Sequence, residues 1–485
     1  MNTMTTATTD AGGSKTPRAA EIDGFRGRLI GDDHADYDSA RAIWNGAIDR
    51  RPRVIARCIG TTDVIAAMRF AREHALEVAV RGGGHNVAGT AVCDGGIVID
   101  LSAMRAVRID PGGRSAWVQG GALWGDVDHE TQVHGLATTG GIVSHTGVAG
   151  LTLGGGVGWL MRKHGLTVDN LLAADVVTAD GELVRASEDE HPDLFWALRG
   201  GGGNFGVVTS FEFRLHSVGP TVLAGPILWD ASDAGEVLRF YRDFVRDAPD
   251  ELGTVVRFGT APPLPVIPRH LHWHPVVMVG TCYAGQIVDG AQVLHPLRAY
   301  RAPLLDLIGP VSYVGFQSAL DSTVLHGWNY YWKSTHLPDL TDDLIDVIAG
   351  RAFSCSSPRS YAAMFHLQGA VSRAAEGGTA FGNRHASHAI TVDAVWRSGE
   401  AFGERDTAWA KDFFAGLGRF RQGVYVNFLG GDEDPDRVRE AYGDSVYDRL
   451  VAVKTTYDPD NVFHCNQNIR PDFRKPVSGA PPGRP

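Results

Sequence analysis

The sequence has few of the features that direct a chain to a membrane, to nucleic acid or to an oxidising compartment. Its five cysteines form no CxxC pair and no disulfide-like spacing, so we expect a reduced, cytoplasmic protein. No apolar run approaches the length of a transmembrane helix. The net charge of −11 argues against nucleic acid or an anionic membrane as a partner. No secretory signal opens the chain, and we expect residues 1–35 to form a disordered tail.

Motifs for phosphate and for metal are missing or weak. No GxxxxGK[ST] loop is present, and Gly201-x-Gly203-x-x-Gly206 lies between a helical segment and a strand. A dinucleotide fingerprint must instead leave a strand and open a helix. On a strand, His270, His272 and His274 would share one face and suit zinc. No acidic or cysteine ligand lies near them in the sequence, so we favour a polar strand facing a substrate cavity and expect no metal.

Glycine is abundant, with 60 residues in 485, and it gathers into three clusters between residues 81 and 206. The first cluster ends a predicted β-α-β unit, with strands at 54–58 and 77–80. Thr61, Thr62 and Asp63 offer N-cap side chains for its helix. The second strand leads into Arg81-Gly-Gly-Gly-His85, and a glycine loop at the end of a β-α-β unit is a familiar way to place backbone N–H groups against a phosphate. We therefore expect a backbone-lined pocket.

His85 directly follows the triple glycine, and two interpretations stay open at this point. The imidazole either hydrogen-bonds to nearby backbone or contacts a ligand in the pocket. Motifs elsewhere in the chain help to decide between them when they are taken together with this loop. The segments concerned are 57–58, 80–86, 147–156, 162–166, 169–170, 193–209, 425–427 and 457–463. Together they resemble the FAD-linked oxidase family typified by berberine bridge enzyme and 6-hydroxynicotine oxidase, within the vanillyl-alcohol oxidase superfamily. The resemblance is dense over 53–215, sparse over the next 200 or so residues, and returns after Gly423.

The resemblance implies an α+β protein of two domains. An FAD-binding domain of two α/β subdomains would span 36–218. A substrate domain at 219–422 would be built on an antiparallel sheet, flanked by helices, that covers the flavin ring. Residues 423–475 would return to the FAD domain, with a strand at 424–429 and a helix at 434–454, before a tail at 476–485.

The resemblance also implies FAD as the cofactor, bonded through its 8α-methyl group to His85. Many relatives carry a second link from a cysteine to position 6 of the ring. That position falls on Val143 here, and Leu151 replaces a histidine that is common in doubly linked relatives, so we expect a single link. The other residues carried over as FAD-binding are Arg81, Gly82, Gly83, Gly84, Asn86, Gly89, Gly141, Gly147, Gly150, Leu151, Gly154, Gly155, Gly158, Asn204, Gly206, Val208 and Asn427.

Tyr425 is the candidate proton acceptor, because it matches the Tyr-x-Asn segment of the family. On a strand Asn427 would share its face and could donate a hydrogen bond to it or to the flavin. An unperturbed tyrosine has a pKa near ~10 and needs such support to act as a base. The alternative is a tyrosine of the core. Phe428 stands where many relatives have a second tyrosine, and Gln368, followed by Arg384, is the next candidate.

The family implies an oxidase that takes a hydride from a small organic substrate and passes the electrons to molecular oxygen, giving hydrogen peroxide. By analogy the substrate is an alcohol, sugar or amine of secondary metabolism. Two alternatives stay open: a flavin dehydrogenase or reductase with another acceptor, and a flavoprotein that confers resistance to a toxic metabolite or sequesters it. We expect a monomer or homodimer with no nucleic acid or membrane partner.

Overall fold

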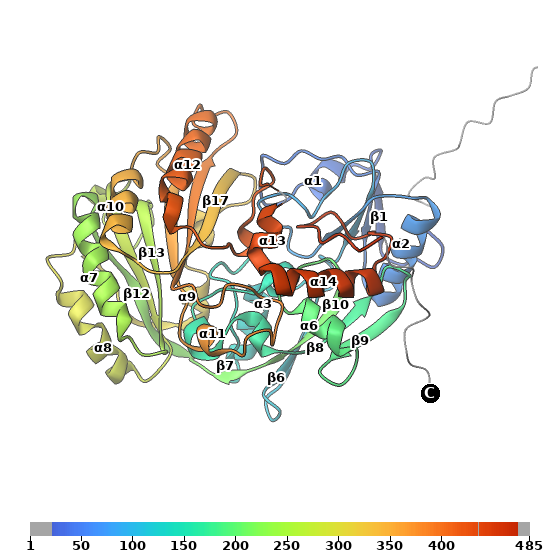
Figure 1. Cartoon of the computed structure of the whole chain (residues 1–485), viewed down its shortest axis with the longest axis horizontal. Coiled ribbons are helices and arrows are strands. Elements are labelled where there is room, and N and C mark those ends of the chain that lie inside the picture. Colours follow the sequence, from blue (N-terminus) through green and yellow to red (C-terminus); the bar gives the residue numbers. More distant parts are fainter. Residues whose placement is uncertain (1–21, 435, 474–485) are drawn as a thin grey trace, which may run out of the picture.

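The first sheet carries the predicted β-α-β unit. In the computed structural model, which describes residues 22–434 and 436–473, this sheet has the order β1-β2-β4-β3 (Figure 1). The strands β2, β4 and β3 are parallel and almost wholly buried, as expected for apolar runs covered on both faces. The elements are β1 (Arg28–Gly31), α1 (Tyr37–Arg41), β2 (Val54–Arg57), α2 (Thr61–Glu73), β3 (Val78–Arg81) and β4 (Ile97–Asp100).

Two predictions for this region were wrong. Residues 28–31, assigned to the tail, form β1 and pair antiparallel with β2; residues 1–21 lie outside the described part. Neither Thr61 nor Thr62 caps α2, because Gly60 occupies the N-cap. Asp63 instead accepts hydrogen bonds from the backbone N–H groups of Arg26 and Ile59, both at 2.9 Å. The acidic side chain therefore fixes the chain that enters the helix.

The second sheet is antiparallel throughout, with the order β5-β6-β10-β8-β9. The third glycine cluster leads from α6 into β10, so it lacks the strand-to-helix context of a dinucleotide fingerprint, as predicted. The strands are β5 (Val107–Asp110), β6 (Ser115–Gln119), β8 (Leu171–Val177), β9 (Leu183–Ser187) and β10 (Val207–Arg214), with a separate pair β7 (Leu136–Ala137) and β11 (His216–Ser217). The helices are α3 (Trp124–Gln132), α4 (Val148–Gly154), α5 (Met161–His164), η2 (Thr167–Asn170) and α6 (Pro192–Leu198).

The third sheet is the large antiparallel sheet expected of the substrate domain. Its order is β15-β12-β14-β13-β18-β19-β17, and β16 pairs with β12. Its strands are β12 (Thr221–Asp230), β13 (Leu252–Thr260), β14 (Pro275–Tyr283), β15 (Leu305–Asp306), β16 (Gly309–Ser312), β17 (Asn329–Leu337), β18 (Tyr361–His366) and β19 (His388–Trp396). The helices of this part are η3 (Ala231–Asp233), α7 (Ala234–Arg246), η4 (Arg269–Leu271), α8 (Ile287–Ala299), α9 (Tyr313–Gln317), η5 (Asp321–Thr323), α10 (Asp342–Arg351), α11 (Ala370–Arg373), α12 (Gly403–Leu417) and η6 (Gly418–Phe420).

The two faces of this sheet have different roles. The helices α7, α8, α10 and α12 lie over one face (Figure 1), and the core between them includes Val256, Met364 and Val392. Side chains alternate along a strand, so their neighbours point the other way. Arg257 and Asp393 are two of those neighbours, and they line a cavity on the opposite face. The alternation thus places charged groups on the side that faces the glycine loops.

The C-terminal segment packs against the second sheet but differs from its predicted secondary structure. No strand forms at 424–429; residues 426–428 make the 3-10 turn η7 (Val426–Phe428). Phe428 N–H and Leu429 N–H donate to carbonyls of this turn at 2.9 and 3.2 Å, so the segment needs no neighbouring strand. The predicted single helix is two, α13 (Asp436–Tyr442) and α14 (Asp444–Tyr457), separated by Gly443 at φ +75°.

The three alternating histidines do not form the predicted strand. They lie on η4 and the turn that follows it, after a proline-rich stretch that cannot supply a strand's N–H groups. His272 Nε2 lies 2.9 Å from the Ile267 carbonyl, and His274 Nε2 lies 2.7 Å from Asp230 Oδ2. These contacts hold His272 and His274 in place, and none of the three histidines lines the cavity.

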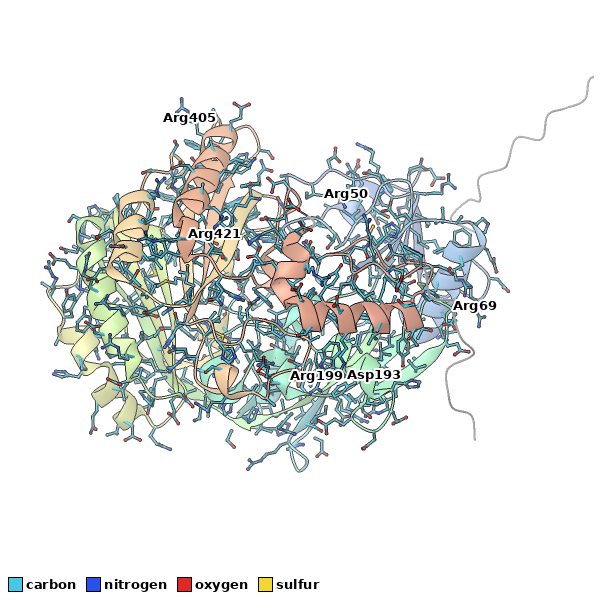
Figure 2. The ribbon with its side chains drawn as sticks, in the orientation of Figure 1. Arg50, Arg69, Asp193, Arg199, Arg405 and Arg421 are labelled. Carbon is cyan, nitrogen blue, oxygen red and sulfur yellow. The ribbon has the colours of Figure 1, made fainter. Side chains whose placement is uncertain are left out.

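The arginines labelled in Figure 2 come from separate parts of the chain, among them Arg69 on α2 and Arg405 on α12. None of the described helices is both long and apolar enough to cross a bilayer.

Candidate active site

A cavity of about 360 Å³ lies where the glycine loops, the open face of the third sheet and the C-terminal segment meet. Two of the loops touch through their backbones, since a Cβ atom on Gly83 would lie 2.5 Å from Gly147 Cα. Only glycine permits this approach. Glycine forms much of the cavity wall, which includes Gly82, Gly83, Gly84, Gly141, Gly147, Gly150, Gly202, Gly203 and Gly206.

Most residues carried over from the family line this cavity. Its glycine wall suits a pyrophosphate and its apolar side chains suit a flat ring system, so the donor set fits FAD. The predicted residues that line it are Gly82, Gly83, Gly84, His85, Asn86, Gly141, Gly147, Gly150, Leu151, Asn204, Gly206, Val208, Tyr425 and Asn427.

Six predicted residues do not line the cavity: Arg81, Gly89, Gly154, Gly155, Gly158 and Gln368. Arg81 supports the loop from beneath by donating to the carbonyls of Ala40 and Ala42. Gln368 Oε1 lies 3.0 Å from His366 Nε2, so the structure does not bring this amide to the site as predicted. Arg384 forms a salt bridge with Asp169 at 2.6 Å.

The four glycines among these six provide close packing. A Cβ on Gly158 would lie 1.7 Å from the Gly140 carbonyl oxygen, and one on Gly89 would lie 2.8 Å from Ile48. A Cβ on Gly154 would meet the Asn427 side chain. These glycines therefore position the loops rather than contact a ligand.

His85 lies in an aromatic cluster that the sequence did not indicate. Its ring stacks on Trp44 at 4.2 Å between centroids, and its Nε2 lies 3.1 Å from His145 Nδ1. His326 completes a group of three imidazoles. Burial, reinforced by His145 and His326, holds the pKa of His85 well below its usual range. His85 is therefore a neutral imidazole at pH 7, with a nitrogen lone pair available to an electrophile.

Val143 and Leu151 also line the cavity. Neither side chain carries a sulfur or an imidazole. The one cysteine among the described lining residues is Cys465, which lies beside Glu77, the residue before β3, rather than beside Val143. Val143, the position that the resemblance assigned to a second flavin link, therefore has no thiol beside it among the described lining residues.

Tyr425 and Asn427 meet as predicted, although through a 3-10 turn and not a strand. The Tyr425 hydroxyl accepts hydrogen bonds from Gly156 N–H at 2.8 Å and from Asn427 Nδ2 at 2.7 Å. Asn427 also donates to the Leu151 carbonyl at 3.1 Å. Burial nevertheless raises the pKa of Tyr425 to about 12, so the phenol keeps its proton at neutral pH.

Asp393 is a functional candidate that the motifs did not reveal. It projects from β19 into the cavity and is 2% exposed, and its Oδ2 has no hydrogen-bond partner among the described residues. Burial raises the pKa of Asp393 to about 7, against the opposing effects of Thr391 and Arg257. Its sequence signal is a lone acidic residue in a strand of apolar and small polar residues, which also fits an exposed strand face.

Comparisons with known proteins agree with this geometry. Residues 52–187 match the FAD binding domain, and residues 424–470 match the berberine and berberine-like family. The chain is 34% identical to (R)-6-hydroxynicotine oxidase of Paenarthrobacter nicotinovorans, over 92% of this chain and 97% of that protein. It is 27% identical to xylooligosaccharide oxidase of Thermothelomyces thermophilus, over 90% of each chain.

Solved structures give the same result. The crystal structure of 6-hydroxy-D-nicotine oxidase from Arthrobacter nicotinovorans superposes with a TM-score of 0.81 at 32% identity, over 92% of this chain and 98% of that one. Glucooligosaccharide oxidase from Acremonium strictum, whose FAD is described as 6-S-cysteinyl and 8α-N1-histidyl, shares the fold with a TM-score of 0.79 at 24% identity. It covers 92% of this chain and 97% of its own. With its FAD-binding domain and glycine-lined cavity, the chain belongs to the berberine bridge enzyme-like family of FAD-linked oxidoreductases.

Proposed function

We propose that the protein is an FAD-dependent oxidase that removes a hydride from a small organic substrate and passes the electrons to molecular oxygen, giving hydrogen peroxide. The observation that carries the proposal is the neutral His85 on the glycine wall, opposite a sheet face that presents Asp393 to the same cavity. Bound FAD supplies the hydride acceptor and the route to oxygen. The side chains described below bind, orient and transfer the proton.

We infer that FAD is attached once, through His85. The imidazole is fixed by its stacking on Trp44 and by its hydrogen bond with His145. Its lowered pKa keeps a nitrogen unprotonated at neutral pH, as a nucleophile must be. Val143 offers no sulfur for a second link.

Asp393 is the proton acceptor that this geometry favours over Tyr425. A general base works best when its pKa lies near the working pH. The pKa of Asp393 is about 7, whereas that of Tyr425 is about 12. The Tyr425 oxygen is also engaged by two donors, while one oxygen of Asp393 has no hydrogen-bond partner within the described residues. We therefore assign proton transfer to Asp393, and the positioning of Asn427 and the Gly156 loop to Tyr425.

The lining beside Asp393 supports a ring-bearing alcohol, sugar or amine as the substrate. The aromatic side chains around the cavity include those of Trp44, Trp332, Tyr361, Phe365 and Phe428. Flat apolar faces bind the faces of rings, and the carboxylate receives an O–H or N–H. Two relatives are named as oxidases of ring-containing compounds, 6-hydroxynicotine and xylooligosaccharides.

A panel of cyclic alcohols, sugars and amines tests the proposal. Under anaerobic conditions a substrate bleaches the flavin, and admission of oxygen restores the colour with one hydrogen peroxide formed per substrate oxidised. Bleaching without reoxidation by oxygen would indicate a dehydrogenase. Tight binding without bleaching would indicate sequestration.

A further inference from the structure

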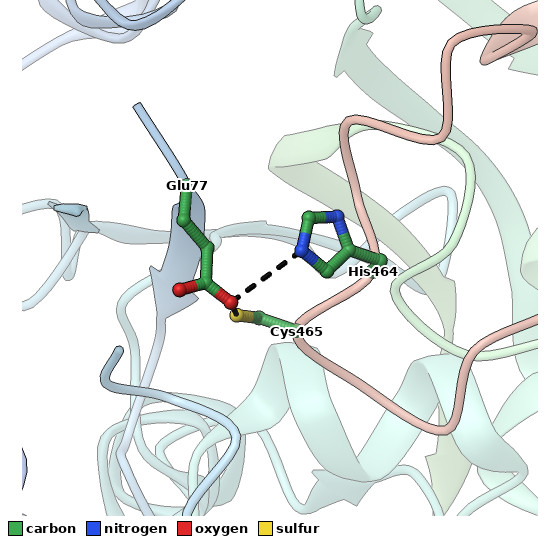
Figure 3. Close-up of side chains that lie close together, drawn as sticks. All are labelled: Glu77, His464 and Cys465. Atoms are coloured by element: carbon green, nitrogen blue, oxygen red, sulfur yellow. Dashed lines mark hydrogen bonds and ion pairs between the residues drawn. The ribbon is translucent and has the colours of Figure 1, made fainter. Parts of the chain in front are cut away.

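A group of three metal-ligating side chains lies at the other end of β3 from His85. Glu77 directly precedes β3, and His464 and Cys465 belong to the segment that follows α14. Figure 3 shows the three side chains pointing toward one another across the junction of the two segments. The catalytic proposal above uses none of them.

The three ligand atoms lie close enough together for one ion to reach them all: the His464–Glu77 separation fits zinc, and Cys465 lies closer to Glu77 than bound zinc would hold it. Cys465 Sγ and His464 Nε2 lie 2.9 and 3.4 Å from Glu77 Oε1, and the three ligand atoms lie within 4.8 Å of one another. Tetrahedral zinc, with bonds of about 2.0–2.3 Å, holds its ligand atoms about 3.3–3.5 Å apart. No second group of three such atoms comes this close within the described residues.

The hydrogen bond on the far side of the imidazole fixes its tautomer. His464 Nδ1 lies 2.8 Å from the Asn461 carbonyl oxygen, which can only accept, so Nδ1 carries the proton. Nε2 is then the nitrogen that faces the Glu77 carboxylate, 3.4 Å from Oε1. A backbone carbonyl behind the imidazole is the usual support of a metal-bound histidine.

We propose that Glu77, His464 and Cys465 bind a zinc ion, or a divalent transition metal of similar softness. A thiolate, an imidazole and a carboxylate form a donor set typical of zinc, with a fourth position left to water. On binding, the Cys465 thiol gives its proton to solvent and a zinc–sulfur bond forms, with no change of oxidation state. Hard cations such as magnesium, which prefer oxygen ligands, do not suit this set.

The site joins two distant parts of the chain beside the cavity. Cys465, Asn466 and Gln467 line the cavity, as does Val78 on the other side of the junction. A bound metal would fasten the C-terminal segment to β3 and so hold this wall in place. Because a ligand that binds the folded state raises its stability, zinc should also raise the melting temperature.

The test uses the flavin-loaded protein, stripped with a chelator and kept reduced with a phosphine. We expect it to bind one equivalent of Zn²⁺ in competition with a chromogenic chelator. Co²⁺ should give the visible bands of a tetrahedral site, at wavelengths beyond the flavin absorption. Both Cys465→Ser and Glu77→Gln should weaken Zn²⁺ binding by at least ~10- to 100-fold and abolish the rise in melting temperature.

His129→Ala is the matched control, because His129 and Glu130 form an exposed imidazole–carboxylate pair at 3.2 Å that has no thiol. It should leave zinc binding unchanged. Glu77 is exposed and lines no part of the cavity, so its variant keeps the test valid if Cys465→Ser folds poorly. A reduced wild-type protein that retains no zinc equivalent, or equal zinc affinity in wild type and both ligand variants, would overturn the proposal.

Discussion

His85 Nε2 lies 3.1 Å from His145 Nδ1, while the plane of the His85 ring stacks on Trp44. The imidazole is thus oriented before any cofactor is considered. Its pKa is lowered by burial and by the two neighbouring histidines, so it stays neutral over the whole physiological range. An oriented, neutral imidazole on a glycine wall is the arrangement that a histidyl–flavin bond requires.

Replacing Asp393 by asparagine should slow flavin reduction. The amide keeps the volume of the side chain but cannot accept the substrate's proton. Loss of a general base typically costs ~100- to 10,000-fold in rate, and stopped-flow measurement of the anaerobic half-reaction would detect it. Reoxidation by oxygen should be nearly unchanged. Reduction at the wild-type rate in Asp393→Asn would remove this residue from the mechanism.

Replacing Tyr425 by phenylalanine should slow flavin reduction less than Asp393→Asn does, and it should lower the stability of the protein more than Asp393→Asn does. The hydroxyl accepts from Gly156 N–H and Asn427, and a buried donor left without its acceptor costs about 1–3 kcal/mol. Thermal or urea unfolding measures the stability, and stopped-flow measures the rate. A rate defect as large as that of Asp393→Asn would identify Tyr425 as the base.

The activity should depend on pH through Asp393. The carboxyl accepts a proton only when ionised, and burial raises its pKa to about 7. The value of kcat/KM should therefore be low below pH 6, rise through pH 7 and level off above about pH 8. This rising limb should disappear in Asp393→Asn. A profile that is flat from pH 5 to 9 in the wild type would contradict the assignment.

A buried ion pair anchors the C-terminal segment. Lys454 Nζ donates to the carbonyls of Asn204 and Phe463 at 2.8 and 2.9 Å and pairs with Asp458, and both side chains are fully buried. Lys454→Met leaves the Asp458 charge uncompensated, which costs about 3–5 kcal/mol. Chemical unfolding measures this loss. Arg419→Met, at the exposed Arg419–Asp343 pair, is the control, and a similar loss there would contradict the argument.

The sequence predicted the parts of the site that depend on backbone shape. Two loops approach each other closely at Gly83 and Gly147, where only glycine fits. The clusters of glycine in the sequence therefore indicated these loops. Trp44 and Asp393 line the cavity and His145 contacts His85 at its edge, each from a different part of the chain. Nothing in their local sequence marks a tertiary meeting of this kind. The predicted strand at 424–429 was wrong. The alternating polar residues there, Tyr425 and Asn427, are brought together by a 3-10 turn and hydrogen-bond to each other.

Gln368 shows the limit of transfer by resemblance. Its region follows β18, where the match to the family is sparse, and at φ +37° the chain turns its amide toward His366. A shift of one residue along a strand reverses the face that a side chain occupies. Side chains alternate between the two faces along β18 and β19. Their register places Asp393, and not Gln368, in the cavity.

The most direct test of the account is mass spectrometry of the denatured protein, intact and after proteolysis. We predict that the wild-type chain carries one FAD, found on a single peptide that contains His85, and that His85→Ala carries none. The yellow colour should stay with the wild-type polypeptide after acid precipitation. Release of all the FAD from the wild-type protein, or a flavin-bearing peptide that contains a cysteine link, would contradict it.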